Sequence, residues 1–314
     1  MAVARVFGAG NENFPVASWL CPPQHRPAVM ALYRYARTAD DIADEGDAAP
    51  ADRLADLADY RQTLDAVLAD PHGSAAEHCR WPQVFGPLAA SHAHWHWPAE
   101  PLHHLLDAFE ADVRHQPMHN DAALLAYCQR SANPVGRLLL HLMRTSGAKL
   151  THGAEEQSDA LCTALQLVNF WQDLAEDLAR GRRYLPQTTR VAAGPAGTAS
   201  ALRLALLHEL ARAETLLAQG APLAWTLSHT PGTRRWGWEL RAIVQGGALR
   251  LRQLRQALLS GWPLWQQALP RSRGFAAQTL LLARRWPMLK PLPSPLISPL
   301  LSPTKAKSSH PHAG

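Results

Sequence analysis

Apolar residues recur three and four positions apart over most of the chain, which is the pattern of helices with one buried face. β-branched residues are few, and the alternation typical of half-buried strands is nearly absent. The pattern therefore predicts an all-α protein. The expected helices cover residues 25–45, 51–69, 100–115, 121–147, 158–180, 200–219 and 235–259. Turn and helix-stop signals separate them, at Pro71 with Gly73, residues 188–197, Gly220 with Pro222, and Pro231 with Gly232.

The composition suits a folded protein with a sizeable core, because 47% of the 314 residues are hydrophobic. We expect one domain over residues 1–286 and a proline-rich, disordered tail over residues 287–314. Within this tail, residues 292–301 are apolar enough to touch a lipid surface or the flank of the protein. The chain begins without the pattern of a signal peptide and holds no run of 18 uncharged apolar residues. We therefore expect a cytoplasmic protein whose contact with the inner face of the membrane, if any, is peripheral.

The charge and the cysteines narrow the function classes further. A net charge of +5 favours anionic partners such as phosphates or lipid headgroups. The four cysteines lie far apart, which indicates neither a disulfide framework nor a zinc knuckle. No P-loop, Rossmann fingerprint, Ser-His-Asp order or nucleic-acid surface is found, although the missing fingerprint does not by itself exclude NADPH.

The strongest chemical signal is an acidic cluster at the end of the first expected helix, in the segment RTADDIADE over residues 37–45. Asp40 and Asp44 lie one turn apart on the face that also carries Tyr33 and Arg37. We call Asp40 and Asp44 the first acidic row. Like charges at this spacing weaken an isolated helix by about 0.2–0.5 kcal/mol per pair, so a cation is expected to offset them.

A second acidic row, Asn169, Asp173 and Asp177, follows Gln166 on one face of a later helix. The basic residues Arg180, Arg182 and Arg183 come directly after it. One such row alone is typical of a solvated helix face with ordinary ion pairs. Two rows favour a site for Mg²⁺ and a diphosphate, because Mg²⁺ is commonly held by a few carboxylates together with substrate phosphates.

These residues carry a resemblance to the squalene and phytoene synthase family over residues 11–286. The matching segments are Asn11–Ser18, the first acidic row, residues 127–136 with the sequence YCQRSANPVG, and residues 169–186. Together they resemble the hydroxysqualene synthase branch of hopanoid biosynthesis. The resemblance implies an isoprenoid synthase-type helical bundle in which the two acidic rows face each other across a deep apolar cavity.

The resemblance also implies the chemistry and the site. The substrate would be presqualene diphosphate, ionised with the help of Mg²⁺, and water would capture the rearranged cation to give hydroxysqualene and diphosphate. The metal ligands would be Asp40, Asp44, Asn169, Asp173 and Asp177. Arg37, Arg182 and Tyr184 match family positions near the phosphates, and Gln166 is expected to bind substrate beside them. Association with other enzymes of the pathway is a further expectation.

Tyr127 matches the cavity tyrosine of the family, on a helix interrupted at residues 133–136. Pro134 cannot donate a backbone hydrogen bond, so a kink is expected there, and a freed carbonyl with Tyr127 could orient a cation or a water. A structural kink beside a core tyrosine is the alternative. The segment Asn11–Ser18 lacks the Ser- and His-containing pattern common in the family, which argues against phosphate binding there.

Other polar clusters are interpreted as ordinary surface. The histidines between His92 and His104 lack the convergent partners of a zinc site. Asp107, Glu110 and Asp112 are interpreted as a solvated face with an ion pair to Arg114. The arginines beyond the second row are also expected to be mostly a solvated basic face; they are Arg250, Arg252, Arg255, Arg271 and Arg273.

Three functions besides hydroxysqualene synthesis stay open. The first is that of a head-to-head condensing enzyme that acts on farnesyl or geranylgeranyl diphosphate. The second is that of a catalytically silent helical subunit that binds a partner enzyme or a lipid. The third is that of a metal-dependent hydrolase of short diphosphates, whose acidic rows would face an open polar pocket.

Overall fold

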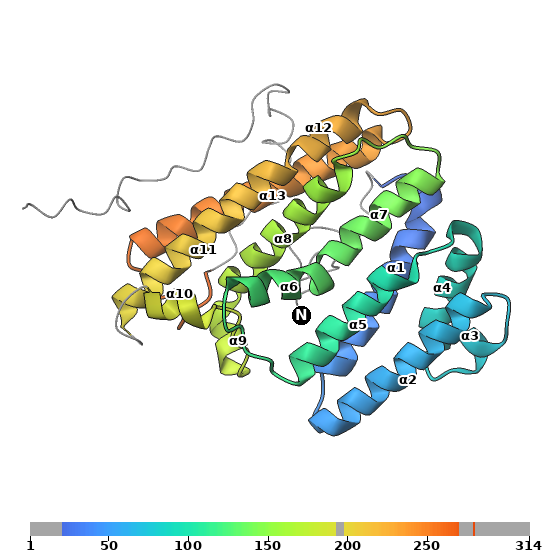
Figure 1. Ribbon diagram of the computed structural model, residues 1–314, viewed down its shortest axis with the longest axis horizontal. Helices are drawn as coiled ribbons and strands as arrows, with labels where there is room; N and C mark the ends of the chain where they lie inside the picture. The colour runs from blue at the N-terminus through green and yellow to red at the C-terminus, as the bar shows by residue number, and fades with distance from the viewer. Residues whose placement is uncertain (1–20, 193–197, 270–278, 280–314) are drawn as a thin grey trace, which may run out of the picture.

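The computed structural model describes residues 21–192, 198–269 and 279, and these residues form helices joined by loops, with no strand among them (Figure 1). A short 3-10 helix, η2 (Pro23–His25), leads into the first α-helix. The α-helices are α1 (Arg26–Asp44), α2 (Pro50–Ala69), α3 (Ala75–His78), α4 (Pro82–Trp95), α5 (Ala99–Val113), α6 (Asp121–Ser131), α7 (Asn133–Thr145), α8 (Ala154–Gln172), α9 (Leu174–Ala179), α10 (Gln187–Ala192), α11 (Ala199–Gly220), α12 (Pro222–His229) and α13 (Arg234–Leu259). The all-α prediction is confirmed.

Two of the predicted helices are broken. The segment 121–147 forms α6 and α7, separated at Ala132, whose φ of −128° and ψ of −47° depart from helical values. The break falls where Pro134 removes a backbone donor, as the sequence predicts. The segment 158–180 forms α8 and α9, separated at Asp173. Asp173 therefore lies between two helices and not within one.

The helices pack around two apolar clusters. One is built mainly from α1 to α5 and α7, and the other mainly from α6, α8, α11 and α13. Figure 1 shows α11 and α13 lying along α8, with α1, α2, α4 and α5 on the opposite side of α7. The first acidic row lies on α1, and the second runs from α8 through Asp173 into α9.

A buried group of aromatic side chains fixes α1 against its neighbours. Tyr35 and Tyr60 stack with ring centroids 5.4 Å apart, and Phe85 packs on Tyr60 at 4.7 Å. The Tyr35 hydroxyl donates to the carbonyl of Leu102 at 3.0 Å, and the Tyr60 hydroxyl donates to the carbonyl of Tyr35 at 3.0 Å. Since both hydroxyls are satisfied, the cluster holds α1, α2, α4 and α5 together without an unpaired phenol.

An apolar cavity lies among α1, α7, α8, α12 and α13. Its volume is about 100 Å³, and none of the residues of the acidic rows lines it. Most of its lining is aliphatic, and includes Val29, Leu139, Leu161, Leu165, Leu223 and Leu227. Such a lining suits a hydrocarbon ligand.

Gly136 on α7 marks a close approach of α7 to α8. A Cβ atom at this position would overlap Ser158 Oγ and lie 2.7 Å from Cys162 Sγ. Gly136, Ser158 and Cys162 all line the cavity. The missing side chain therefore lets the two helices meet at this wall of the cavity.

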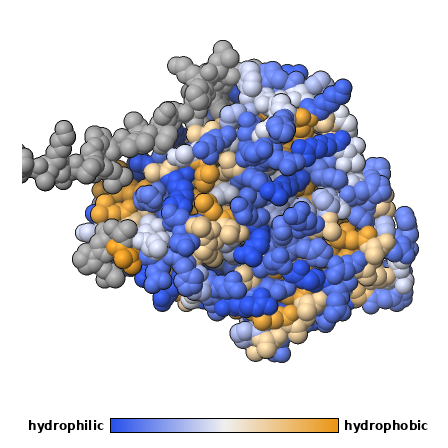
Figure 2. Space-filling view, in the orientation of Figure 1, coloured by the Kyte–Doolittle hydropathy of each residue, from blue (hydrophilic) through white to orange (hydrophobic). Residues whose placement is uncertain are grey.

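The surface shown in Figure 2 is polar over most of its area, with smaller apolar patches between the charged side chains. Among the described residues, no helix has both the length and the apolar character needed to cross a membrane. The predicted domain boundary at residue 286 and the proline-rich tail lie outside the described residues.

Candidate active site

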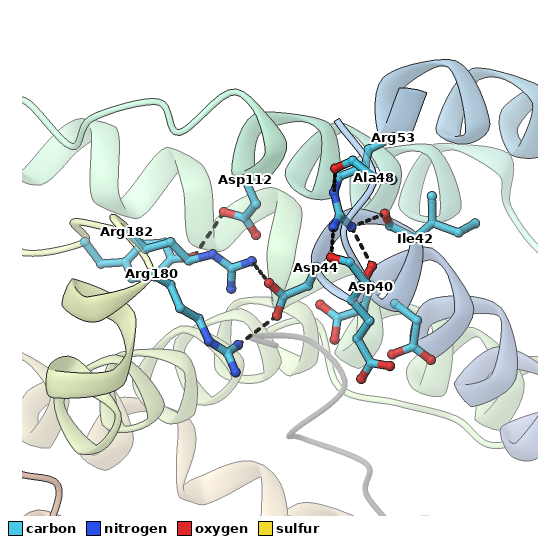
Figure 3. Close-up of polar contacts among 12 residues, drawn as sticks. Asp40, Ile42, Asp44, Ala48, Arg53, Asp112, Arg180 and Arg182 are labelled. Carbon is cyan, nitrogen blue, oxygen red and sulfur yellow. Dashed lines mark hydrogen bonds and ion pairs between the residues drawn. The ribbon is translucent and has the colours of Figure 1, made fainter. Parts of the chain in front are cut away.

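The first acidic row lies near the end of α1, on the helix face turned inward. The Asp40 side chain is 2% exposed and that of Asp44 is 10% exposed. The end of α1 is fixed by Arg53, whose guanidinium donates to the carbonyls of Ile42, Glu45, Gly46 and Ala48 (Figure 3). These bonds satisfy carbonyls that a helix end leaves without helical partners.

Arg37, predicted to lie near phosphates, is held among the acids of its own helix. Its guanidinium lies 3.5 Å from Asp40, 2.7 Å from Asp41 and 2.7 Å from Glu45. Burial raises the pKa of Asp41 to about 6, and Arg37 acts in the opposite direction. Arg37 thus supplies part of the positive charge that the acidic cluster requires.

The second acidic row spans the junction of α8 and α9. Its members are buried, with Asn169 and Asp173 each 6% exposed and Asp177 7% exposed. A backbone bond from Asp177 N to Asp173 O at 2.9 Å links α9 to the break. The row therefore continues across the interruption of the helix.

Asp173 is positioned by a chain of side chains from α13. Arg250 Nε donates to Gln172 Oε1 at 2.7 Å, and Gln172 Nε2 donates to Asp173 Oδ1 at 3.3 Å. Arg250 is only 4% exposed. Its predicted place on a solvated basic face was wrong, because its guanidinium is buried and bound to the Gln172 amide and to the carbonyl of Leu269.

Two arginines join the acidic rows. Arg180 Nη1 lies 3.0 Å from Asp44 Oδ2, and Arg182 Nη2 lies 2.5 Å from Asp44 Oδ1 (Figure 3). The turn that carries them is closed by the bond from Arg182 N to Asp177 O at 2.8 Å, and Gly181 adopts a φ of +79° within it. Glycine fits this left-handed conformation without strain. Segments more than 130 residues apart thus meet in one charged site.

Arg182 is the more buried of the two arginines, at 7% side-chain exposure against 44% for Arg180. Burial alone lowers the pKa of a guanidinium, but Tyr184, Asp112 and Asp44 oppose this effect and raise the pKa of Arg182 above its usual range. The side chain is therefore a permanent cation at the centre of the site.

Asp112 was wrongly placed on a solvated face. It is buried, and it accepts hydrogen bonds from Tyr127 at 2.6 Å and from Tyr184 at 3.1 Å. Burial raises the pKa of this carboxyl, and its two tyrosine bonds act in the opposite direction. Asp112 on α5 thus orients both predicted tyrosines, a role that its irregular spacing in the sequence did not reveal.

The tyrosines form an aromatic group with Phe170. Tyr184 stacks on Phe170 with ring centroids 3.9 Å apart, and Tyr127 lies 5.9 Å from Phe170. Burial raises the pKa of both phenols well above the usual value, so both stay protonated. Their rings offer π faces beside the second acidic row, which suit a neighbouring positive charge.

Gln166 is completely buried, and neither its amide oxygen nor its amide nitrogen has a hydrogen-bond partner in the protein. The same holds for the hydroxyl of Ser131, the last residue of α6. A buried amide without partners is costly, by about 1–3 kcal/mol per group. Such groups are typical of a site that binds a polar ligand.

The remaining predicted features lie away from this site or outside the described residues. Asp107 and Glu110 each lie 2.8 Å from Arg61, and Glu110 also pairs with Arg114 at 3.2 Å, so the solvated-face interpretation holds for these two acids. His92 contacts the carbonyl of Leu68, and His103 pairs with Asp65. Asn11–Ser18, Arg271 and Arg273 lie outside the described residues.

The donor atoms of the two rows suit Mg²⁺, which prefers carboxylate and amide oxygens. In the conformation described, both Asp44 oxygens are bound by arginines. Among residues 21–192, 198–269 and 279, no three His, Cys, Asp or Glu side chains are grouped to hold a metal ion. A metal at Asp44 would therefore replace arginine contacts, while Asp40, Asn169, Asp173 and Asp177 offer further oxygen donors.

Two acidic rows, an arginine pair and an apolar cavity on an all-α fold are typical of a protein that binds an apolar molecule with a charged head. The sequence profile described as squalene/phytoene synthase matches residues 8–273. The chain belongs to the squalene/phytoene synthase family, and it is accordingly an enzyme that acts on isoprenoid diphosphates.

Curated relatives with more than one activity match the chain. It is 38% identical over 196 residues to the hydroxysqualene synthase of Zymomonas mobilis, covering 62% of this chain and 61% of that protein. It is 34% identical to the hydroxysqualene synthase of Rhodopseudomonas palustris, over 78% of this chain and 80% of that protein. The presqualene diphosphate synthase of Zymomonas mobilis is 30% identical, over 82% of this chain and 84% of that protein.

A solved structure supports the same fold. The squalene synthase HpnC from Alicyclobacillus acidocaldarius superimposes with a TM-score of 0.66 at 29% identity, covering 77% of this chain and 88% of that chain. The isoprenoid synthase-type architecture predicted from the sequence is thereby confirmed.

Proposed function

We propose that this protein is a hydroxysqualene synthase that converts presqualene diphosphate and water to hydroxysqualene and diphosphate. The observation that carries the proposal is the pairing of Asp44, from the first acidic row, with Arg180 and Arg182, which directly follow the buried second row, in a protein that also holds a cavity lined by aliphatic side chains. The hydroxysqualene synthases among the relatives support the choice of reaction.

In this proposal the charged end of the site binds the diphosphate and the cavity holds the hydrocarbon. Arg182 and Arg180 donate to phosphate oxygens, for which the planar guanidinium is well suited. Mg²⁺ held by Asp40, Asp44, Asn169, Asp173 and Asp177 would supply Lewis-acid stabilisation of the leaving diphosphate. Such binding requires Asp44 to exchange its arginine partners for metal, while the arginines turn to the diphosphate.

The residues next to the charged end would then guide the cation. Asp112 keeps the Tyr127 and Tyr184 rings in place, and these rings with Phe170 face the region where positive charge develops. The aliphatic walls exclude bulk water and thereby limit side reactions of the cation.

A head-to-head condensation of farnesyl or geranylgeranyl diphosphate is the second candidate, because relatives named presqualene diphosphate synthase and phytoene synthase also match the chain. Purified protein with Mg²⁺ and without NADPH would be incubated with presqualene diphosphate or with farnesyl diphosphate, and the products identified by mass. Hydroxysqualene from presqualene diphosphate alone is expected. A C30 product from farnesyl diphosphate would contradict the proposal and favour the condensing enzyme.

The same assay distinguishes the proposed enzyme from a silent subunit and from a hydrolase. A silent subunit would bind presqualene diphosphate without releasing diphosphate, and a hydrolase would release phosphate from short soluble diphosphates.

A further inference from the structure

Two completely buried polar side chains without partners lie on helices that face each other. Ser131 ends α6, and Gln166 lies near the end of α8. The Ser131 hydroxyl, the Gln166 amide oxygen and the Gln166 amide nitrogen all lack hydrogen-bond partners in the protein. An amide that is 0% exposed has no access to bulk solvent that could satisfy it.

The contacts between these helices place the two side chains at the same height along the helix axes. Tyr127 packs against Phe170, and farther along Asn133 accepts a hydrogen bond from Thr163 at 2.9 Å. The segment from α6 into α7 therefore runs antiparallel to α8. Between these two contacts, Ser131 falls opposite the turn of α8 that carries Gln166.

This level is the junction between the cavity and the charged site. Along α8, Leu161 and Leu165 line the cavity, whereas Asn169 begins the second acidic row. Gln166 lies between them. On the facing segment, Val135 and Gly136 line the cavity just beyond Ser131. A substrate whose hydrocarbon fills the cavity and whose diphosphate lies at the acidic rows would have its reacting carbon at this junction.

We propose that Ser131 and Gln166 hold the water molecule that captures the cation, an inference that rests on the proposed function. A water has two donors and two acceptors, so it satisfies a hydroxyl and an amide at once. Ser131 ends α6 at the helix break, where the backbone of Ala132 leaves helical values.

The reaction balances without a further reactant. The C–O bond of presqualene diphosphate breaks, and its electron pair leaves with the diphosphate. After rearrangement of the carbon skeleton, a lone pair of the bound water forms the new C–O bond. The resulting oxonium loses one proton to the departed diphosphate. If no water is in place, the cation instead loses a proton from carbon and becomes a hydrocarbon.

The test is the variant Ser131→Ala, assayed in the full chain with Mg²⁺ and presqualene diphosphate. Diphosphate release and the ratio of hydroxysqualene to C30 hydrocarbon are measured separately. We expect the ratio to fall about tenfold, the effect of one lost hydrogen bond, while diphosphate release stays within about threefold of the wild type. Ser228→Ala is the matched control, because that hydroxyl already donates to the carbonyl of Ala224 at 2.6 Å and lies on α12.

An unchanged product ratio in Ser131→Ala would overturn the water site and leave the proposed function intact. Absence of diphosphate release from the wild type would instead contradict the proposed function itself. A crystal structure of the full chain gives a second measurement that does not depend on turnover. It is expected to show an ordered water bound to Ser131 Oγ and to the Gln166 amide, and a direct bond between these two side chains would contradict the proposal.

Discussion

The first acidic row lies on one unbroken helix, whereas the second crosses a helix break at Asp173. The first row is supported from outside by Arg53, which bonds four backbone carbonyls at the end of α1. The second row is supported by side chains, through Gln172 and Arg250, and continues into a turn that carries Arg180 and Arg182. Helix α1 thus presents fixed acids, and the second segment brings the cations that meet them.

The largest expected effect concerns Asp173, at the break in the second row. Asp173→Asn removes a negative charge from the proposed metal and diphosphate site, so we expect diphosphate release from presqualene diphosphate to fall about 10³-fold. Glu176→Gln, an exposed position on the neighbouring α9, is the control and should change the rate less than about threefold. Equal losses in both variants would contradict a special role for the row.

The next effect separates the two arginines. Arg182→Gln is expected to lower kcat/KM about 100-fold, because Arg182 is the buried one of the two cations paired with Asp44, and its loss leaves only the half-exposed Arg180. Arg180→Gln, which removes a half-exposed arginine from the same carboxylate, should cost about fivefold or less. Steady-state kinetics on presqualene diphosphate measure both losses of kcat/KM. A larger loss for Arg180→Gln than for Arg182→Gln would show that burial does not decide which arginine is the more important.

The third prediction concerns the pH dependence of the contacts that hold the two segments in place. The end of α1 is held by Arg53, whereas α10, which follows the second segment, is bound through Thr189 to Glu209 and Asp121. Glu209 is fully buried, and burial raises its pKa to about 7, against the opposing effect of Arg212. Because the folded-state pKa exceeds the unfolded value of 4.5, the stability that Glu209 contributes is present below pH 4.5 and is lost as pH rises toward 7.

Urea unfolding of the wild type and Glu209→Gln between pH 5 and pH 7.5 tests this prediction. The free energy of unfolding of the wild type should fall relative to the variant by about 2 kcal/mol over this range. Glu214→Gln, on the same helix but paired with Arg255 at 2.5 Å, is the control. A difference between wild type and Glu209→Gln that is independent of pH would contradict the assignment.

The smallest effect concerns Asp112, whose hydrogen bonds go to Tyr127 and Tyr184, which belong to neither acidic row. Asp112→Asn keeps the shape of the side chain but weakens its bonds to Tyr127 and Tyr184, so we expect kcat to fall about tenfold with KM nearly unchanged. Asp107→Asn on the same helix is the control. A loss confined to KM would indicate that the tyrosines act in substrate binding and not in guiding the reaction.

The sequence predicted the long helices well, because periodic apolar faces and nearby stop signals agree in α1, α2, α5, α11 and α13. It missed α4, in which Pro87 and a run of histidines hide the pattern. The predicted stop at Gly220 with Pro222 falls where α11 ends, but the sequence missed α12, which begins at Pro222. Regular spacing is visible in a sequence, whereas the direction of the chain after a turn is not.

The candidate site was predicted only in part, because sequence spacing reveals motifs but not contacts between distant helices. Asp44 meets Arg182, and Tyr127 and Tyr184 meet at Asp112, and each of the predicted residues belongs to a recognisable motif. The joint binding of a metal by the two rows stays a prediction. Asp112 and Arg250 were assigned to solvent because nothing in their local sequence reveals burial. Their positions depend on packing between helices that are distant in the sequence, which spacing alone does not encode.

Gly136 sets a limit on how this enzyme can be redesigned. Because a methyl group at Gly136 would overlap the Ser158 hydroxyl and the Cys162 thiol, enlarging that residue would force these two side chains to move. All three residues line the cavity, so such a change would alter its wall at α7 and α8 together. Leu223 and Leu227 on α12 line the cavity from another helix, and exchanging them for smaller residues would enlarge it without this overlap.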